Sequence, residues 1–345
     1  MAQELDRLRR LAPEEVARME LRYDILSAIA NRGPIGRRAL AASLQKPERT
    51  VRTEADCLRM LGLVQPAAGG MRVTADGEEL LGQLQPMLRA LSGVDRLGQQ
   101  LRQYLEVGAV YVQAGDVEQD PMVLRELCRQ AGNVILGGLK EESTLAVMGG
   151  TTMATLAAML PRAQLPGVVV VPARGGLGEN MDMQANTVAA QCARRLGAQY
   201  RMLHLPDDIE PAALEHMAEH GPVQEVLRRV QRPDVLTYGI GRADAMTQRR
   251  ALPAEQARLL MENGAVAEAL GCYFDLEGRM VYAASHLGLD VHALDGVGCT
   301  VAVAGGRSKA QAILAVVRGT HPSALFVDEA AALTLLELLG ERQRN

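Results

Sequence analysis

The chain has 345 residues, 48% of them hydrophobic, and a formal net charge of −4. That length can bury a substantial core and predicts one large domain or two unequal ones. The sequence has no Trp and only two Phe, so side chains that stack on single-stranded nucleic acid are scarce, and duplex DNA is the nucleic acid that the composition favours.

Cellular location and metal binding are also constrained by the sequence. No apolar run approaches the roughly 18 residues that would span a bilayer, and the N-terminus lacks the apolar core of a secretory signal. We therefore expect a cytoplasmic protein with no membrane partner. The five cysteines have neither metal-ligand nor redox spacing, so we expect reduced thiols, no metal site and no cofactor.

Charge is divided unevenly along the chain. Residues 1–72 contain 13 Lys and Arg against 9 Asp and Glu, whereas the remainder is net negative. A basic end suits an approach to phosphates, and an acidic body stays clear of them. The division fits a DNA-binding end, although moderate splits also arise between domains that bind no nucleic acid.

Three helices are predicted in the basic end. Apolar residues recur at helical spacing over residues 21–31, before a stop at 31–34, and again over residues 37–44. Pro47 is placed to begin a third helix over residues 48–62. The predicted buried stripe of this helix consists of Val51, Ala55, Leu58 and Leu61.

The outward face of the third helix has the residue types of a recognition helix. Arg can donate two hydrogen bonds to guanine, and Thr can contact bases or phosphates. An isolated basic helix is more often a solvated surface. Directly downstream, however, a strand, a glycine turn at residues 67–70 and a second strand at 71–73 predict the wing of a winged helix-turn-helix. The candidate DNA contacts are Arg37, Arg38, Lys46, Arg49, Thr50, Arg52, Thr53 and Arg72.

A long helical pattern follows over residues 76–106. Its leucines fall roughly on one stripe, which either joins subunits or packs on the body of the same chain. Pro86 and Gly93 interrupt the stripe, so a straight coiled coil is not expected.

From Ala109 onward, short β-branched runs alternate with helical stretches, which predicts an α/β domain with a mostly parallel, Rossmann-like sheet. In such sheets, ligands bind beyond the carboxyl ends of the strands, where helix N-termini present N–H groups. Four predicted strands end in polar or glycine-rich turns: 144–148 before GGTT (149–152), 168–171 before PARGGLG (172–178), 235–238 before GIGR (239–242) and 300–304 before GGRSK (305–309).

The GGTT and GGRSK turns have the composition of phosphate-binding turns. Either one alone is more often a tight connection, but together with Arg174 and Lys309 they favour a phosphorylated ligand. Gln184, Asn186 and Glu268 are candidate acceptors for ligand hydroxyl groups. The pair at residues 249–250 either clamps an anion or is an exposed surface pair.

Several motifs in fixed order carry a family resemblance. They are IGRR with the helix-turn-helix, GGTT, VPARGGLGE (171–179), QAN (184–186), YGIG (238–241), MTQRR (246–250) and AVAGGRSKAQAI (302–313). Together, from about residue 21 to 339, they resemble the SorC/DeoR-type bacterial regulators. That resemblance implies a winged helix at residues 1–75, a helical linker at 76–106, and a sugar-phosphate-binding domain at 107–345 that shares its fold with ribose-5-phosphate isomerase and glucosamine-6-phosphate deaminase.

The resemblance further implies a homodimeric or homotetrameric repressor of glycolytic operons. Its partners would be double-stranded operator DNA and a phosphorylated sugar, fructose 1,6-bisphosphate foremost, which releases the repressor. Gly149 and Ser308 complete the two phosphate turns, and Arg307 stands where the family leads us to expect a small residue. The ligand contacts that the resemblance implies are Gly150, Thr151, Thr152, Arg174, Gln184, Arg250, Glu268 and Lys309.

A second function stays open at this point, because fold alone does not settle function. It is a sugar-phosphate isomerase or deaminase with an appended basic domain. Such chemistry needs a positioned acid and base. The candidates are Glu268 and the pair Asp328 and Glu329, none of which has a His nearby in the sequence.

Overall fold

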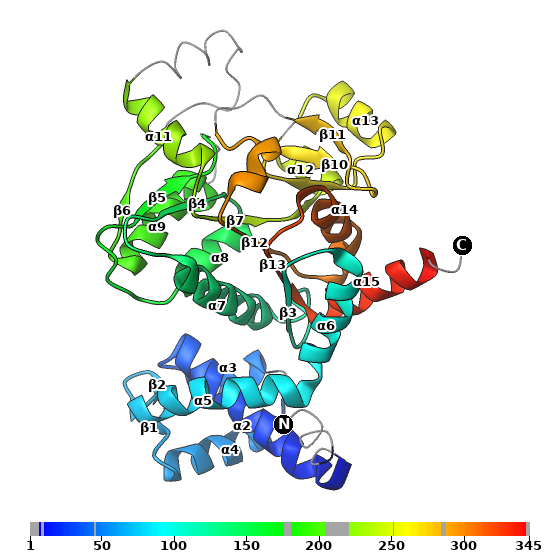
Figure 1. Cartoon of the computed structure of the whole chain (residues 1–345). Helices are drawn as coiled ribbons and strands as arrows, with labels where there is room; N and C mark the ends of the chain where they lie inside the picture. The colour runs from blue at the N-terminus through cyan, green and yellow to red at the C-terminus, as the bar shows by residue number, and fades with distance from the viewer. Residues whose placement is uncertain are drawn as a thin grey trace. The chain divides into compact units, whose positions relative to one another are not determined.

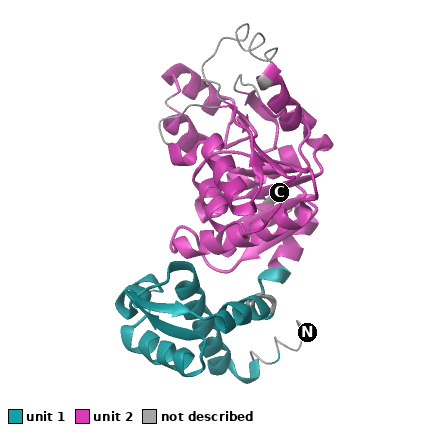
Figure 2. Ribbon diagram, turned by 90° about the vertical axis from the view of Figure 1, so that its left-hand side faces the viewer, with its two compact units in different colours: residues 1–96 teal, residues 97–345 magenta. Residues whose placement is uncertain are grey.

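The computed structural model describes residues 7, 10–44, 46–175, 181–203, 221–250, 252–283 and 288–342. The chain divides into two compact units, residues 1–96 and 97–345, which Figure 2 shows in different colours. Among the described residues, no helix is both long and apolar enough to cross a membrane.

In its described residues, the first unit has three helices followed by a two-stranded antiparallel hairpin and a further helix. The buried side chains of Ile25, Ile29, Leu40 and Val51 form its core. The hairpin is joined to the helices by a bridge between Ile35 and Met71. This is the element order predicted from the sequence. In chain order the elements are α2 (Pro13–Arg32), α3 (Arg37–Ser43), α4 (Glu48–Met60), β1 (Val64–Ala67), β2 (Gly70–Val73) and α5 (Ala75–Ser92).

The predicted apolar stripe of α4 is confirmed at three of its four positions. Val51, Ala55 and Leu58 are buried, but Leu61 is 59% exposed. Helix α4 ends at Met60, so Leu61 is the residue after the helix and no longer follows its periodicity. The prediction that Leu61 is buried was wrong for that reason.

The long helix predicted after the hairpin is two helices. Thr74 caps the first by accepting a hydrogen bond from the Gly77 N–H. Gly93 adopts a left-handed φ of 77° and separates α5 from α6 (Val94–Leu105), whereas α5 continues through Pro86, so only one of the two expected breaks occurs. The side chains of Leu84 and Met87 pack against α2, which favours packing on the same chain over a subunit joint.

The second unit is built on a parallel seven-stranded sheet in the order β3-β13-β12-β7-β4-β5-β6 (Figure 1). Strands β4, β5 and β13 are buried along their whole length, as expected of a sheet covered on both faces. The bounds are β3 (Ala109–Gln113), α7 (Pro121–Gly138), β4 (Thr144–Val147), α8 (Thr151–Met159), β5 (Val169–Pro172), η1 (Met181–Met183), α9 (Ala185–Leu196), β6 (Gln199–Tyr200), α11 (Gly221–Gln231), β7 (Val235–Gly239), β12 (Cys299–Val303), η3 (Arg307–Lys309), α14 (Ala310–Thr320), β13 (Ala324–Asp328) and α15 (Glu329–Arg342).

The sheet changes direction between β4 and β7. From β4 the chain moves outward through β5 and β6, then returns to β7 on the other side of β4 and moves outward through β12 and β13. Right-handed crossovers therefore place α7, α8 and α9 on one face and α14 on the other, and α14 packs against α15. The crevice for a ligand in such a sheet lies at this change of direction, beyond the carboxyl ends of β4 and β7.

An antiparallel sheet is inserted between β7 and β12, and the sequence did not predict it. Its strand order is β11-β10-β9-β8. The strands are short, so their alternation is too brief to detect by periodicity. The insertion comprises β8 (Gly241–Arg242), α12 (Ala243–Arg249), α13 (Ala254–Glu262), β9 (Ala267–Ala269), β10 (Cys272–Phe274), β11 (Met280–Ala283) and η2 (Val291–Gly296).

Candidate functional site

The candidate effector site begins with four neighbouring strands. In the order β12-β7-β4-β5 they are all parallel, so their carboxyl ends lie at one edge of the sheet. The GGRSK turn, the GIGR segment, the GGTT turn and Arg174 follow these strands in that order. The sequence prediction that these four strand ends meet at one edge is confirmed.

The GGTT turn is shaped by close backbone contacts. A Cβ on Gly149 would lie 2.5 Å from the Met183 carbonyl oxygen, and the Gly150 N–H donates a 2.7 Å hydrogen bond to the same oxygen. Gly150 has a φ of 112° and precedes α8, to which no side chain of the described residues supplies a cap. The first N–H groups of α8 can therefore meet an anion beyond β4. Thr151 is exposed and Thr152 is buried.

The Met183 contact brings the QAN motif to the GGTT turn. Gln184 follows Met183 directly and is half-buried at the start of α9. Asn186, the other predicted hydroxyl acceptor, is buried, and its amide both donates to and accepts from the backbone of Leu203. Asn186 thus serves the fold. Residues 176–179 of the VPARGGLGE motif lie outside the described residues.

The GGRSK turn holds a cation at the other end of the strand set. Lys309 ends η3 and is half-buried, while Arg307 and Ser308 are exposed. Burial lowers the pKa of the Lys309 ammonium, the charges of Glu118 and Asp328 raise it, and that of Arg249 lowers it. Lys309 therefore lies near both carboxylates and near Arg249.

Arg249 links this cation to the GGTT turn. Its guanidinium contacts the Met183 sulfur, and Met183 in turn accepts the Gly150 hydrogen bond described above. A side chain at Gly239 would come within 3.6 Å of Thr152 Cβ and 3.8 Å of the Val303 carbonyl, so the ends of β7, β4 and β12 are also adjacent through the backbone. The two predicted phosphate turns therefore belong to one region.

A second group of charged residues, Arg174, Arg250 and Glu268, lies at the inserted sheet. Arg250 Nη2 lies 2.8 Å from Glu268 Oε1, and Glu268 is 5% exposed. Arg174 is buried and its backbone forms a bridge with Gly288. The pKa of the Cys272 thiol is raised to about 11, first by burial and then by the charge of Glu268, whereas Arg174 and Arg250 pull it down. All three charged groups hence lie around Cys272.

The pair proposed for acid and base chemistry has structural partners. Asp328 is fully buried and accepts hydrogen bonds from the N–H groups of Val117, Gly306 and Ala331, at 2.7, 2.9 and 3.1 Å. Burial raises the pKa of Asp328, and these three hydrogen bonds lower it. Glu329 accepts from the Gly115 N–H. A carboxylate that pins three backbone segments is poorly placed to move protons on a ligand.

Sequence reasoning missed Glu118. The backbone N–H and the hydroxyl of Ser308 both donate to Glu118 Oε1, across 190 residues of sequence. Glu118 lies in the loop from β3 to α7, beside other acidic and polar residues, and no local pattern distinguishes it. Only the position of β3 in the sheet brings this loop to the GGRSK turn.

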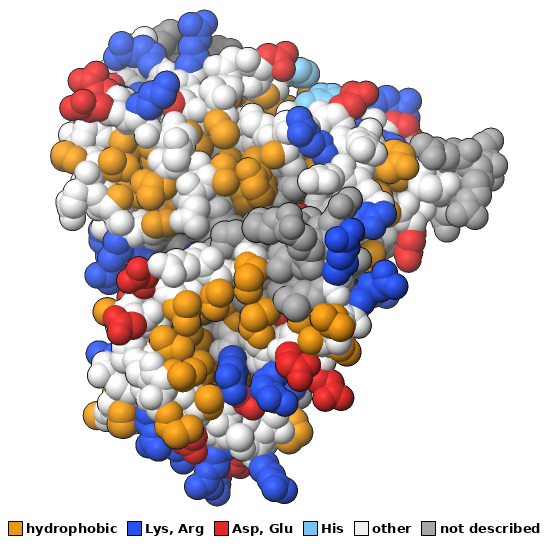
Figure 3. Space-filling view, turned by 60° about the horizontal axis from the view of Figure 1, so that its bottom comes forward, with side chains coloured by type: hydrophobic (Ala, Val, Ile, Leu, Met, Phe, Trp, Pro, Cys, Tyr) orange, Lys and Arg blue, Asp and Glu red, His pale blue; other side chains and the backbone are white. Residues whose placement is uncertain are grey.

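The candidate DNA contacts of the first unit separate into two groups. Arg37 forms a 2.5 Å ion pair with Asp56, and Arg38 lies 3.7 Å from Glu48, so these two arginines also serve α3 and α4. Basic and acidic side chains are interspersed on the face seen in Figure 3. The remaining candidates are exposed, and the described residues supply no ion pair to them: Lys46, Arg49, Thr50, Arg52, Thr53 and Arg72.

Comparison with known families covers nearly the whole chain. Residues 18–88 match the family model of the CggR N-terminal DNA binding domain, and residues 89–337 match the model described as "Putative sugar-binding domain". The chain is 38% identical over 330 residues to the central glycolytic genes regulator of Priestia megaterium, covering 95% of this chain and 96% of that protein. It is 36% identical to the regulator of the same name from Bacillus subtilis, covering 97% and 99%.

Solved structures agree with this assignment. A SorC family transcriptional regulator from Enterococcus faecalis matches with a TM-score of 0.66 and 34% identity, over 70% of this chain and 99% of that one. The full-length sorbitol operon regulator SorC from Klebsiella pneumoniae matches 87% of this chain and 93% of its own with a TM-score of 0.65; at 19% identity this likeness shows the fold alone. The chain belongs to the SorC/DeoR-type family of bacterial transcriptional regulators, and so it is a regulator with a DNA-binding and a sugar-binding domain rather than an enzyme.

Proposed function

We propose that the chain represses glycolytic genes and that a phosphorylated sugar, fructose 1,6-bisphosphate foremost, lowers its affinity for operator DNA. The observation that carries this proposal is that two glycine turns, after β4 and β12, lie at the sheet edge where the strand order changes direction between β4 and β7. Each turn precedes a helix. Lys309 belongs to the second turn, and Arg249, which lies near Lys309, contacts Met183 beside the first turn. The regulators of Priestia megaterium and Bacillus subtilis support the choice of glycolytic genes through their names.

A bisphosphate accounts for both groups of charges. One phosphate would bind at the GGRSK turn beside Lys309, and the rest of the ligand would extend toward Arg174, Arg250 and Glu268. The carboxylate of Glu268 can accept hydrogen bonds from sugar hydroxyl groups, and Gln184 can do the same through its amide oxygen. Thr151 and Thr152 add hydroxyl donors for phosphate oxygens.

Release from the operator requires that the effector bind one state of the regulator more tightly than the other. Family resemblance leads us to propose a homodimer or homotetramer, in which a sugar phosphate favours the arrangement that holds DNA less well. The wing and α4 would contact the duplex, with Arg49 and Arg52 toward base edges and Arg72 toward a phosphate. Operator DNA lies in the bacterial cytoplasm, and we place the protein there.

The test is fluorescence anisotropy with a labelled duplex carrying the upstream region of a glycolytic operon. We expect binding at moderate salt and release on titration with fructose 1,6-bisphosphate. A chain that never binds the duplex, or that binds equally well at saturating sugar phosphate, contradicts the proposal.

Effector identity is tested separately by thermal unfolding with a panel of sugar mono- and bisphosphates. A ligand that binds only the folded state raises the melting temperature by mass action. We expect the largest rise with fructose 1,6-bisphosphate. A larger rise with a monophosphate would reassign the effector while leaving repression in place.

A further inference from the structure

Glu118 occupies the GGRSK turn as a ligand anion would. Its Oε1 accepts hydrogen bonds from both the backbone N–H of Ser308, at 3.2 Å, and the Ser308 hydroxyl. A Cβ on Gly306 would lie 2.7 Å from the same oxygen. The carboxylate therefore rests directly on the turn at the point where glycine permits close approach.

The charges around Glu118 match those of a phosphate site. The charge of Glu118 acts on two cations: it opposes the burial that lowers the pKa of Lys309, and it adds to the Asp244 contact that raises the pKa of Arg242, so both cations lie near Glu118. A backbone N–H, a hydroxyl and two cations are the groups that a phosphate oxygen seeks. The Glu118 carboxylate already accepts from the N–H and the hydroxyl of Ser308, whereas Arg242 is paired with Asp244.

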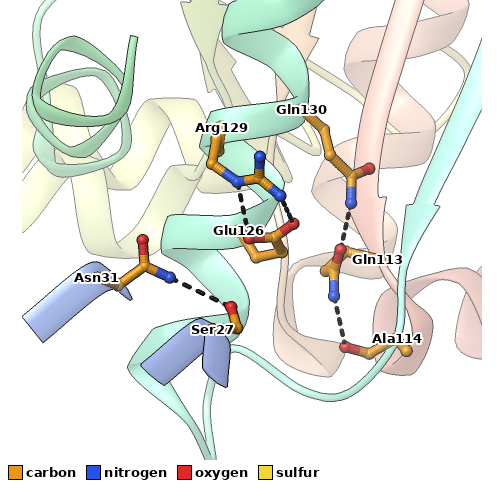
Figure 4. A network of polar contacts seen from close by, with 7 residues as sticks. All are labelled: Ser27, Asn31, Gln113, Ala114, Glu126, Arg129 and Gln130. Carbon is orange, nitrogen blue, oxygen red and sulfur yellow. Dashed lines mark hydrogen bonds and ion pairs between the residues drawn. The ribbon is translucent and has the colours of Figure 1, made fainter. Parts of the chain in front are cut away.

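The loop that carries Glu118 is fastened in the residues just before it. At the end of β3, Gln113 accepts a hydrogen bond from the buried Gln130 of α7 and donates one to the Ala114 carbonyl (Figure 4). The N–H of Gly115 is held by Glu329 and that of Val117 by Asp328. These contacts hold the backbone of Glu118 beside the turn. The Glu118 side chain is exposed, so it can adopt a rotamer that faces solvent instead.

We propose that Glu118 is a built-in competitor of the effector: its carboxylate must leave the 306–309 turn before a phosphate group can bind there. The inference rests on the proposed function, because it assigns the ligand's phosphate to this turn. Two anions cannot share the same donors, so the contact between Glu118 and Ser308 reduces effector affinity and sets the concentration at which the regulator responds. Replacing Glu118 should therefore improve effector binding.

The test is isothermal titration calorimetry of the full chain with fructose 1,6-bisphosphate, comparing wild type with Glu118→Gln and Glu118→Ala. Glu118→Gln removes the charge, and Glu118→Ala removes the whole competitor. Because Glu118 is exposed, we expect about a twofold to fivefold gain in affinity for Gln and at least as much for Ala. Glu141→Gln is the control, since Glu141 is also exposed but lies at the opposite edge of the sheet, just before β4.

The sign of the change separates competition from a structural role. A residue that merely shapes the turn would weaken binding when replaced, so unchanged or weaker affinity in both variants overturns the inference. If wild type shows no binding, the choice of fructose 1,6-bisphosphate as effector fails, while repression is tested separately by DNA binding. Binding gained by Glu118→Ala would then still support the competitor, and no binding by any of the variants would overturn it.

Discussion

Arg250 and Glu268 form a 2.8 Å ion pair between the end of α12 and the middle of β9. The side chain of Glu268 is 7% exposed and that of Arg250 is 26% exposed. Glu268 Oε1 also accepts a 3.1 Å hydrogen bond from the Gly271 N–H. A buried carboxylate thus fixes a guanidinium that remains accessible to a ligand.

Glu268→Gln should loosen Arg250 and weaken effector binding. Removing one charge of a largely buried pair leaves the other poorly compensated, so we expect about 2 kcal/mol less unfolding free energy and roughly a tenfold loss of sugar-phosphate affinity. Urea unfolding and calorimetry measure the two effects. The control is Glu262→Gln, which breaks the ion pair between Glu262, 54% exposed, and Arg258, 61% exposed. It should lower the unfolding free energy by at most about 0.5 kcal/mol. Equal losses in the two variants would contradict this role for Glu268.

Gly149→Ala should damage the effector site through the backbone. The new Cβ would meet the Met183 carbonyl at 2.5 Å, so the segment before Gln184 must move. We expect a loss of about 1–3 kcal/mol in stability and a clear loss of sugar-phosphate affinity. Gly137→Ala provides the contrast, because that helical position has open space and Ala should stabilise it by about 0.5–1 kcal/mol. Thermal unfolding with and without ligand distinguishes them, and a neutral Gly149→Ala would argue against the tight turn.

Effector affinity should fall on the alkaline side because of Lys309. Burial lowers its pKa, so the ammonium loses its proton at a lower pH than an ordinary lysine does. The ligand's phosphates are already dianionic there, since their second pKa is about 6. Calorimetry from neutral to alkaline pH should show weakening for wild type, and weak, pH-independent binding for Lys309→Met. A Lys140→Met chain that behaves like Lys309→Met would contradict the assignment.

The same shift has the opposite sign for stability without ligand. A lysine whose folded pKa lies below its unfolded value binds its proton less tightly in the folded state. The unfolding free energy therefore rises with pH from the folded pKa toward the unfolded one. Lys309→Met should remove that rise.

Arg52→Ala should weaken operator binding without unfolding the first unit. Arg52 is exposed on α4, and the described residues give it no ion pair, so its loss removes only a DNA contact. We expect about a tenfold loss, typical of one base or phosphate contact. Arg59→Ala is the matched control on the last turn of the same helix, where Arg59 lies 3.6 Å from Asp56. Unchanged anisotropy for Arg52→Ala would argue against α4 as the recognition helix.

The parts of the fold that depend on local pattern were predictable. The stripe of Val51, Ala55 and Leu58 follows helical periodicity, and the strands before GGTT and GGRSK are short runs bounded by glycine. The prediction that Leu61 is buried was wrong because a helix end is set by capping geometry, which the periodicity of apolar residues does not encode. The break at Gly93 was found because glycine tolerates a left-handed φ.

The parts that depend on distant pairing were not predictable. Arg250 and Glu268 were each singled out by sequence, but their ion pair requires the inserted sheet. Glu118 reaches Ser308 only because the first strand of the sheet, β3, pairs with the last, β13. The sequence makes Asp328 a candidate catalytic acid, but its carboxylate accepts hydrogen bonds from three backbone N–H groups that no sequence pattern indicates.

The pairing of β3 with β13 also bears on how the regulator is made. A ribosome delivers the DNA-binding unit first, and its helices and hairpin make local contacts that form quickly. The sheet of the second unit stays open at β3 until nearly the last residues emerge. Under the proposed function, a nascent or truncated chain would carry the DNA-binding unit without a complete effector domain, so premature release during synthesis would yield a DNA binder that a sugar phosphate could not remove from its operator.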